Sequence, residues 1–329
     1  MKVAILHNPR PEVIPAGVPD DTYEEYDGQV TVQAIAGALK RLGLESEPVI
    51  ADKTMVRRLE EGGFGFVFNI AEGSGRRCRE AVPAAVCELL GIPYTGSDAL
   101  TLAVTLDKAT ARRVVSPEVP VAAGALVERD EDFARLDALR YPVLVKPNDE
   151  GSSKGIRSNP IANDAAEAIA RCQWLREQYG CAALVEEFVS GVEVTVGITG
   201  NGPEARCLGA MEIAPVNATA PFVYSLEVKR NWREEVRYFV PPRLDAEVLG
   251  ELHRLALTAY RLLGCLDFAR MDFRLDASGR PHFLECNALP GLNPESSDIV
   301  FLSRDTVPYD SLVQGILVDA ARRQGVNFA

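Results

Sequence analysis

The chain has 329 residues, of which 47% are hydrophobic and 25% are charged, and its formal net charge is −12. This length exceeds what one hydrophobic core usually organises, so two or three domains with a cleft between them are expected. The negative charge argues against a nucleic-acid partner. The sequence has no apolar run of about 18 residues and no apolar leader, so we expect no membrane association and a cytoplasmic protein.

The cysteines and histidines do not form a metal-binding pattern. The seven cysteines are scattered along the chain without a Cys-x-x-Cys pair, which indicates free thiols in a reducing compartment. The three histidines, His7, His253 and His282, lie far apart in sequence, so a zinc site is not expected.

The first hundred residues alternate between strand and helix patterns. Apolar runs at residues 2–6, 48–51 and 64–70 predict strands, whereas residues 32–42 and 80–90 have helical spacing. This alternation predicts a mostly parallel sheet covered by helices. No Gly-x-Gly-x-x-Gly turn follows the first strand, so a dinucleotide-binding domain loses its main support. Asp98 is expected to cap a helix that runs to about residue 115.

From residue 141 the chain becomes rich in predicted strands. The stretch from residue 214 to about residue 238 shows little periodicity, and its length predicts a functional loop that closes over the site. Helical patterns occur at residues 248–263 and 311–323. Strands are predicted at residues 143–146, 183–189, 193–199, 208–213, 268–275 and 282–285.

A loop rich in glycine, serine and lysine follows the predicted strand at residues 143–146. The sequence KPNDEGSSKG at residues 146–155 places two lysines, two serines and two glycines within ten residues. Such a loop can present backbone N–H groups and cationic side chains to phosphate oxygens. For this segment alone, a plain surface hairpin is the alternative.

Two carboxylates and an amide lie on the closely spaced strand pair near the C-terminus. Asp272 is on the first strand, and Glu285 and Asn287 share one face of the second because side chains alternate along a strand. Arg270 shares the face of Asp272. Carboxylate and amide oxygens suit Mg²⁺. A solvated strand face with incidental acids is the alternative.

Acidic residues also lie at a predicted turn between two strands. Glu186 and Glu187 end one strand, and Glu193 begins the next. A carboxylate at a strand end can accept hydrogen bonds from ribose hydroxyls, as acidic residues do in other nucleotide sites. Solvated acids are common at strand ends, so this feature alone does not identify a nucleotide site.

Taken in this order, the phosphate loop, the acidic strand ends and the metal-binding acids resemble the ATP-grasp superfamily, and within it the D-alanine–D-alanine ligase family. The resemblance implies an α/β fold of three domains, with ATP between the last two: an N-terminal parallel-sheet domain at 1–100, a central ATP-grasp subdomain at 101–190 and a catalytic domain at 191–329. It extends over nearly the whole chain and rests on IPYTGS at 92–97, DK at 107–108, YPVLVKP at 141–147, EGSSKG at 150–155, EEFVSGVEVTVG at 186–197, RMDF at 270–273 and FLECNALPGL at 283–292.

The resemblance also implies an activity and its cofactors. It implies an ADP-forming ligase that converts a carboxylate into an acyl phosphate and joins it to an amine. The cofactors are ATP and two Mg²⁺ ions, for which Mn²⁺ can substitute, and the substrates are small amino acids or other carboxylates. A homodimer is implied as well.

Roles for individual residues follow from the resemblance. They are ATP binding by Lys108, Lys146, Ser153, Glu186, Glu187, Val189, Glu193 and Lys229; metal binding by Asp272, Glu285 and Asn287; stabilisation of the reacting groups by Arg270, Ser152 and the backbone at Gly291; and substrate binding by Glu24, Glu25, Arg230 and Ser296.

Three departures from the family pattern fall on the substrate side. The family has a Gly-Gly-x-Ser-x-Glu stretch near its N-terminus, where this chain has DDTYEEYDG at residues 20–28. Many members have a histidine where Glu72 precedes Gly73. A lysine–tyrosine pair is replaced by Lys229-Arg230. A permanently charged arginine predicts a polar or anionic first substrate in place of D-alanine.

Two alternative functions remain open at this stage. One is a ligase of the same chemistry that acts on substrates other than D-alanine in a biosynthetic or resistance pathway. The other is an ATP-binding scaffold without catalysis, although every metal and phosphate position holds a competent residue.

Overall fold

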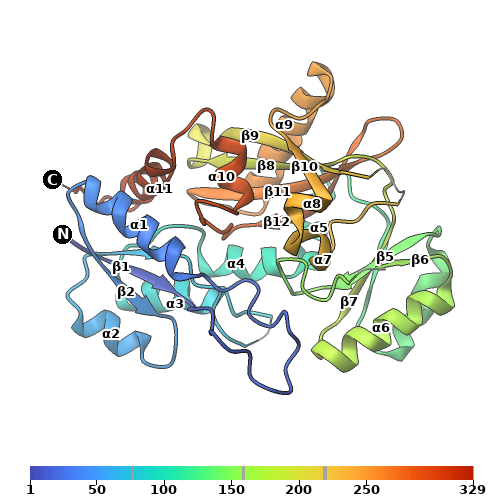
Figure 1. The fold of residues 1–329 in the computed structure, drawn as a ribbon, viewed down its shortest axis with the longest axis horizontal. Coiled ribbons are helices and arrows are strands. Elements are labelled where there is room, and N and C mark those ends of the chain that lie inside the picture. The colour runs from blue at the N-terminus through green and yellow to red at the C-terminus, as the bar shows by residue number, and fades with distance from the viewer. Residues whose placement is uncertain (76, 158–159, 218–220, 329) are drawn as a thin grey trace.

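The fold is built from three separate β-sheets with helices packed around them (Figure 1). It is given by a computed structural model that describes residues 1–75, 77–157, 160–217 and 221–328. The N-terminal sheet, the central sheet and the C-terminal sheet follow one another along the chain. Within the described residues, no helix has the length and apolar character needed to cross a membrane.

The N-terminal sheet is parallel, as the alternation of strands and helices predicts. Its strand order is β2-β1-β3, and the middle strand is buried on both faces through its apolar residues Val3, Ala4, Ile5 and Leu6. The sheet and its helices comprise β1 (Lys2–His7), α1 (Gln29–Arg41), β2 (Glu45–Ile50), α2 (Met55–Glu61), β3 (Phe66–Asn69) and α3 (Ala81–Leu90).

The single helix expected from Asp98 to about residue 115 is two helices, α4 (Ala99–Leu106) and α5 (Lys108–Val115). Asp98 caps the first, as predicted, by accepting a hydrogen bond from the Thr101 backbone N–H at 2.8 Å. The prediction of one continuous helix was wrong because Asp107 caps the second in the same way, with an extended backbone. The break turns Lys108 toward the interior of the molecule.

The central sheet is small and antiparallel, with strand order β4-β7-β5-β6. One helix, α6 (Ala165–Tyr179), packs on it through Ala168, Cys172 and Leu175 and leaves most of its surface in solvent. This narrow apolar stripe explains why no helix was predicted there. The remaining elements are β4 (Gly124–Val127), η1 (Asp130–Ala138), β5 (Val143–Pro147), β6 (Ile161–Ala162) and β7 (Ala183–Glu187).

The C-terminal sheet is antiparallel, with strand order β10-β9-β8-β11-β12. The predicted long helix, α9 (Ala246–Leu262), packs on it in the largest hydrophobic cluster, which also includes residues of α4 and α5. The other elements are β8 (Glu193–Thr199), η2 (Gly202–Glu204), β9 (Arg206–Pro215), β10 (Val236–Phe239), β11 (Phe268–Leu275), β12 (Pro281–Asn287), α10 (Asp298–Ser303) and α11 (Tyr309–Arg323).

The segment predicted as a long irregular loop is largely structured. It contains α7 (Leu226–Arg230), α8 (Trp232–Glu235) and β10, and its aromatic side chains Trp232 and Tyr238 pack with Phe301 of α10. Each element is only four or five residues long, so the sequence shows no helical or strand period. Residues 218–220 of this predicted loop lie outside the described residues.

Candidate active site

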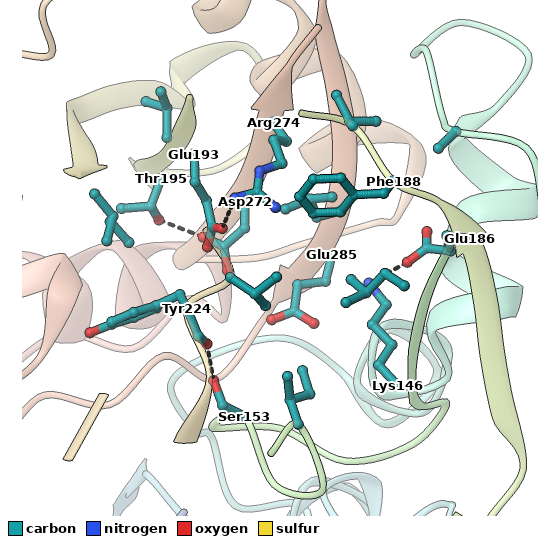
Figure 2. Close-up of a pocket in the computed structure, with 18 of the residues that line it drawn as sticks. Lys146, Ser153, Glu186, Phe188, Glu193, Thr195, Tyr224, Asp272, Arg274 and Glu285 are labelled. Carbon is teal, nitrogen blue, oxygen red and sulfur yellow. Dashed lines mark hydrogen bonds and ion pairs between the residues drawn. The ribbon is translucent and has the colours of Figure 1, made fainter. Parts of the chain in front are cut away.

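Two adjoining cavities lie between the sheets. The inter-sheet cavity is bounded by β5 and β7 of the central sheet and by β8, β11 and β12 of the C-terminal sheet (Figure 2). The N-terminal cavity, with a volume of about 390 Å³, lies between residues 24–31 and the loop that follows β12. Apart from Arg230, every site residue predicted from the sequence lines one or both cavities.

A buried cation marks one side of the inter-sheet cavity. The Lys146 ammonium lies 2.6 Å from a carboxylate oxygen of Glu186, which also pairs with Arg112 (Figure 2). Burial, together with Lys108 and Arg112, lowers the pKa of Lys146 to about 7, although Glu285 opposes the shift. An anionic ligand beside Lys146 would therefore be stabilised by a strong, poorly hydrated interaction.

The phosphate loop predicted from the sequence borders both cavities. Ser152 and Ser153 have positive φ angles of 49° and 59°, and the Ser153 hydroxyl donates to the Tyr224 carbonyl at 3.0 Å. A positive φ is uncommon outside glycine, and such backbone concentrates at ligand sites. The loop is also tied to the N-terminal segment, because the Gly151 N–H donates to Glu25 at 2.7 Å.

The predicted metal ligands lie together on the paired strands β11 and β12. Asp272 is directly opposite Glu285, and Arg270 is opposite Asn287. Burial raises the pKa of Asp272, although Arg270 opposes the shift. Burial acts in the same direction on Glu285, but Lys108 and Lys146 outweigh it and lower the pKa of Glu285 to about 2.

This donor set fits a divalent cation. Two partly buried carboxylates face each other. The side-chain oxygen of Asn287 already accepts a hydrogen bond from the Leu289 N–H at 3.0 Å, which fixes the amide orientation. Oxygen donors of this kind are the ligands that Mg²⁺ prefers. Arg270 donates to Asp272 and to Asp298, at 2.8 and 3.0 Å, and lines both cavities.

Glu193, expected at the ribose, lies in the inter-sheet cavity beside two residues that the sequence analysis missed. Its carboxylate is 3.5 Å from Arg274, whose guanidinium stacks on the Phe188 ring. Burial raises the pKa of Glu193, although Arg274 opposes the shift. A signal for Arg274 was present, since residues 270, 272 and 274 alternate along one strand.

Lys108 lines the N-terminal cavity and not the inter-sheet cavity, where we expected it to bind ATP. Its ammonium is 3.4 Å from Glu285 and donates to the Glu150 carbonyl. Other residues that line the N-terminal cavity are Glu24, Glu25, Asn287, Gly291 and Ser296, all expected at the site.

The two cavities share one wall. Residues from the phosphate loop, α7 and the paired strands line both of them, so a group bound in one cavity lies next to a group bound in the other. Tyr224 and Asp298 belong to this wall and were missed by the sequence analysis, because neither falls in a recognisable motif. The shared residues are Ser152, Tyr224, Lys229, Arg270, Glu285 and Asp298.

Arg230 is a described residue that lines neither cavity. Its guanidinium pairs with Asp20 at 2.6 Å and with Glu24 at 2.9 Å. Neighbouring residues on a helix point about 100° apart, so α7 directs Lys229 into the cavities and Arg230 toward the N-terminal segment. Because its charge is already matched, Arg230 does not support the expected preference for an anionic first substrate.

Comparisons with known proteins identify the family. The family described as D-ala D-ala ligase C-terminus matches residues 118–318. The chain is 30% identical to the uncharacterized protein y4sG of Sinorhizobium fredii, covering 88% of this chain and 87% of that protein. It is also 30% identical to a D-alanine–D-alanine ligase of Bordetella avium, covering 89% and 90%. The crystal structure of a Bacillus anthracis D-alanine–D-alanine ligase with ATP superimposes with a TM-score of 0.75, at 22% identity and 99% coverage of both chains.

The fold and its two adjoining cavities define an ATP-grasp enzyme, and so an ATP-dependent ligase. Because the family match covers more than half of the sequence, the chain belongs to the D-alanine–D-alanine ligase family. The fold class and the family inferred from the sequence are thereby confirmed.

Proposed function

We propose that this protein is an ADP-forming ligase that phosphorylates the carboxylate of one substrate and joins the acyl phosphate to the amine of an amino acid. One observation carries the proposal: the two cavities meet at Ser152, Lys229, Arg270 and Glu285. A nucleotide in one cavity and a carboxylate in the other would meet at a wall of cations and metal-binding groups.

ATP would occupy the inter-sheet cavity. Lys146, Lys229 and the loop at Ser152 and Ser153 would bind its phosphates, because these groups combine positive charge with an exposed backbone. Residues from the end of β7 would receive the adenine, and Glu193 would accept from the ribose. The residues at the end of β7 that line the cavity are Glu186, Glu187, Phe188 and Val189.

Asp272, Glu285 and Asn287 would hold the Mg²⁺ ions, for which we propose two sites and a tolerance for Mn²⁺. When bound, the ions neutralise charge on the transferred phosphoryl group and on its leaving oxygen. Lys108 and Arg270 surround Glu285 with positive charge, which keeps that carboxylate ionised and able to act as a ligand.

The protein side of the reaction is positioning and charge stabilisation. The substrate carboxylate attacks the γ-phosphorus, and ADP leaves. The amine then attacks the acyl carbon, a C–N bond forms, and inorganic phosphate leaves as the amine loses a proton. Arg270 and the backbone at Gly291 would stabilise the developing oxyanion, a contribution of about 3–4 kcal/mol in comparable sites.

The test is Mg²⁺-dependent ADP release with D-alanine and with a panel of D- and L-amino acids. A non-catalytic scaffold would bind Mg-ATP and release no ADP with any substrate. Binding itself is measured by thermal denaturation, where Mg-ATP at 100 times its dissociation constant should stabilise the folded chain by about 2.7 kcal/mol. Light scattering of the same samples tests the homodimer that we propose.

A second candidate, a ligase for substrates other than D-alanine, is favoured by the walls of the N-terminal cavity. Glu72, which replaces a histidine common in the family, lines this cavity together with Glu25 and Glu80. The D-alanine–D-alanine ligase of Bordetella avium and the uncharacterized protein y4sG are equally similar to this chain. Relative kcat/KM across the amino-acid panel decides between the two candidates.

A further inference from the structure

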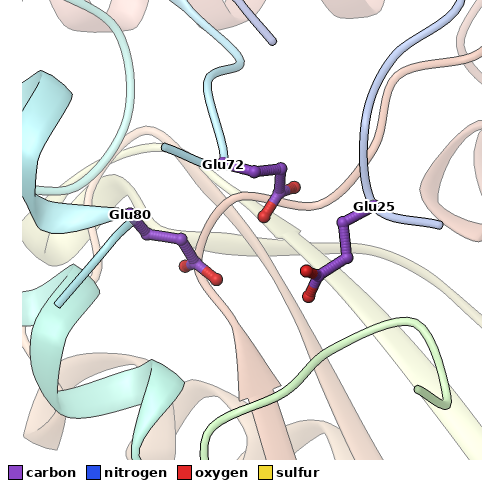
Figure 3. Close-up of side chains that lie close together, drawn as sticks. All are labelled: Glu25, Glu72 and Glu80. Atoms are coloured by element: carbon purple, nitrogen blue, oxygen red, sulfur yellow. The ribbon is translucent and has the colours of Figure 1, made fainter. Parts of the chain in front are cut away.

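Three carboxylates converge on one wall of the N-terminal cavity. Glu25 precedes α1, Glu72 follows β3 and Glu80 precedes α3, and Figure 3 shows their side chains directed toward one another. One oxygen of each lies within 4.8 Å of the others. Like charges at such separations repel, so this arrangement is stabilised either by nearby positive charge or by protonation of an acid.

The residues that the structure describes supply only part of that charge. Glu25 is matched, because Arg79 contacts both of its oxygens at 2.9 Å and Lys154 lies 3.2 Å away. The same two cations also pair with Glu150. Among the described residues, four carboxylates, counting Glu72 and Glu80, are thus in reach of these two cations.

Glu72 and Glu80 have neither a hydrogen bond nor an ion pair from their carboxylates within the described residues. Glu80 retains only 8% of its surface exposed and is directed into the cavity. Burying a carboxylate without a partner is costly, so such a group is expected to meet a ligand. Lys108, another cation lining the cavity, is paired with Glu285.

The pKa values of Glu72 and Glu80 indicate that these carboxyl groups have too little positive charge around them. Burial, with Glu25 and Glu150 adding to it and Arg79 and Lys108 opposing it, raises the pKa of Glu80 to about 7. Burial, Glu80, Glu25 and Asp27 raise the pKa of Glu72 well above its ordinary value, against Arg79. A bound cation would reverse both shifts.

The position of Glu72 and Glu80 in the cavity favours a cationic group of a substrate as their ligand. Glu72 and Glu80 line the same cavity as Arg270, Gly291 and Ser296, which are placed at the reacting groups and the second substrate. A metal ion bound by all three acids would have to displace Arg79 and Lys154 from Glu25. An organic cation on a flexible side chain can reach Glu72 and Glu80 and leave those pairs intact.

We propose that the substrate bound in the N-terminal cavity carries a side-chain ammonium or guanidinium group, in addition to its reacting group, and that Glu72 and Glu80 bind this cation. This inference rests on the proposed ligase function. It assigns the substrate to the class of basic amino acids and diamino acids. D-Alanine, with its neutral methyl side chain, offers these carboxylates no cation beyond its α-ammonium.

The first experiment compares matched amino acids in the ADP-release assay: lysine with norleucine and ornithine with norvaline, as D- and L-enantiomers, each alone and with D-alanine. Hydrogen bonds to charged groups are worth about 1.5–3 kcal/mol, so kcat/KM should favour the cationic member about 10- to 100-fold. Equal or better use of the neutral member would overturn the inference.

Variants assign the preference to the two acids. Glu80→Gln and Glu72→Gln should each reduce the ratio of kcat/KM for lysine to that for norleucine at least about fivefold, since glutamine keeps the shape and removes the charge. Glu60→Gln, on the exposed face of α2, is the matched control and should keep the wild-type preference. An undiminished preference in both cavity variants would overturn the assignment.

A binding measurement separates this inference from the ligase proposal. Calorimetry of lysine and norleucine is carried out with a non-hydrolysable ATP analogue and Mg²⁺. Lysine binding that Glu80→Gln weakens, without ADP release from any substrate, would support the cation site and exclude the ligase. ADP release with neutral substrates, and none with lysine, would support the ligase and exclude the cation site. Mn²⁺ binding without nucleotide, lost in Glu80→Gln, together with no lysine binding, would show a metal site and overturn the inference.

Discussion

Asp272 on β11 lies directly opposite Glu285 on β12, and the same register places Arg270 opposite Asn287. Antiparallel pairing brings such opposed residues close together on one face of a sheet. Two like-charged carboxylates in this position destabilise each other, and Arg270 and Lys108 offset part of the repulsion. The strand pair is therefore arranged to receive further positive charge.

The Asp272→Asn substitution tests that arrangement. Asparagine has the same shape but removes one negative charge from the metal site, so ADP release should fall at least about 100-fold and need more Mg²⁺. Thermal stability should change little, because Arg270 keeps its pair with Asp298 and repulsion with Glu285 is relieved. Asp305→Asn, an exposed control, should retain full activity. Full turnover by Asp272→Asn would refute the metal assignment.

The residues that we assign to the nucleotide could be grouped from the sequence because each part of this group is local. Lys146 lies near the end of β5 and the two serines follow that strand, while Asp272 and Glu285 lie on strands joined by a short turn. Alternation along a strand and pairing across a tight turn are set by neighbouring residues. Contiguous motifs therefore placed these side chains in the inter-sheet cavity without knowledge of the whole fold.

The substrate side could be anticipated from the sequence only in part, because its contacts join distant parts of the chain. Glu25, Glu72 and Glu80 come from three segments and meet only when the N-terminal sheet has folded. The direction of the Arg230 side chain depends on its contact with Asp20, 210 positions earlier. The hydrophobic periodicity of a sequence gives no information on contacts between distant segments. Two short motifs, the Lys229-Arg230 pair and the Glu72-Gly73 pair, showed where the family pattern changes but not in which direction.

Lys146 should make nucleotide binding depend on pH. Its pKa is lowered to about 7 in the free protein, and a bound phosphate would raise it. The ammonium form therefore predominates below about pH 7. Above this pH, binding must take up a proton, so Mg-ATP affinity should fall with rising pH, by up to about tenfold per unit. Calorimetry between about pH 7 and 8.5 measures this slope. Lys146→Arg stays charged and should show no such fall; an equal slope in both proteins would contradict the assignment.

Arg79 should contribute strongly to stability. Its side chain is 5% exposed, pairs with Glu25 and Glu150, and donates to the Asp149 carbonyl at 2.7 Å. Removing one member of a buried ion pair leaves an uncompensated charge, so Arg79→Met should lower the free energy of unfolding by about 3–5 kcal/mol in urea denaturation.

The matched control for Arg79 is Arg254→Met. Arg254 is 58% exposed and pairs only with Glu251 on the surface of α9, among the described contacts. An exposed pair of this kind contributes at most about 0.5 kcal/mol. Similar losses of stability in the two variants would show that the ion pairs of Arg79 with Glu25 and Glu150 contribute no more than an exposed pair.

The Arg230→Tyr substitution restores the residue type that the family has beside this lysine, and the structure predicts that it will not restore a preference for D-alanine. Arg230 is directed away from both cavities and pairs with Asp20 and Glu24, with 34% of its side chain exposed. Partly exposed pairs contribute about 0–1 kcal/mol, so their loss should raise KM by no more than about fivefold for every substrate. The ratio of kcat/KM for D-alanine to that for other amino acids should stay constant.

Arg230→Lys separates charge from shape in the same assay. It keeps a cation near Asp20 and Glu24 but loses the planar fork, so its KM values should fall between those of the wild type and Arg230→Tyr. The decisive quantity is again the ratio of kcat/KM for D-alanine to that for lysine. A rise of about tenfold or more in that ratio, confined to Arg230→Tyr, corresponds to about 1.4 kcal/mol of discrimination. Such a rise would show that residue 230 contacts the substrate during turnover, in contrast to its contacts in this structure.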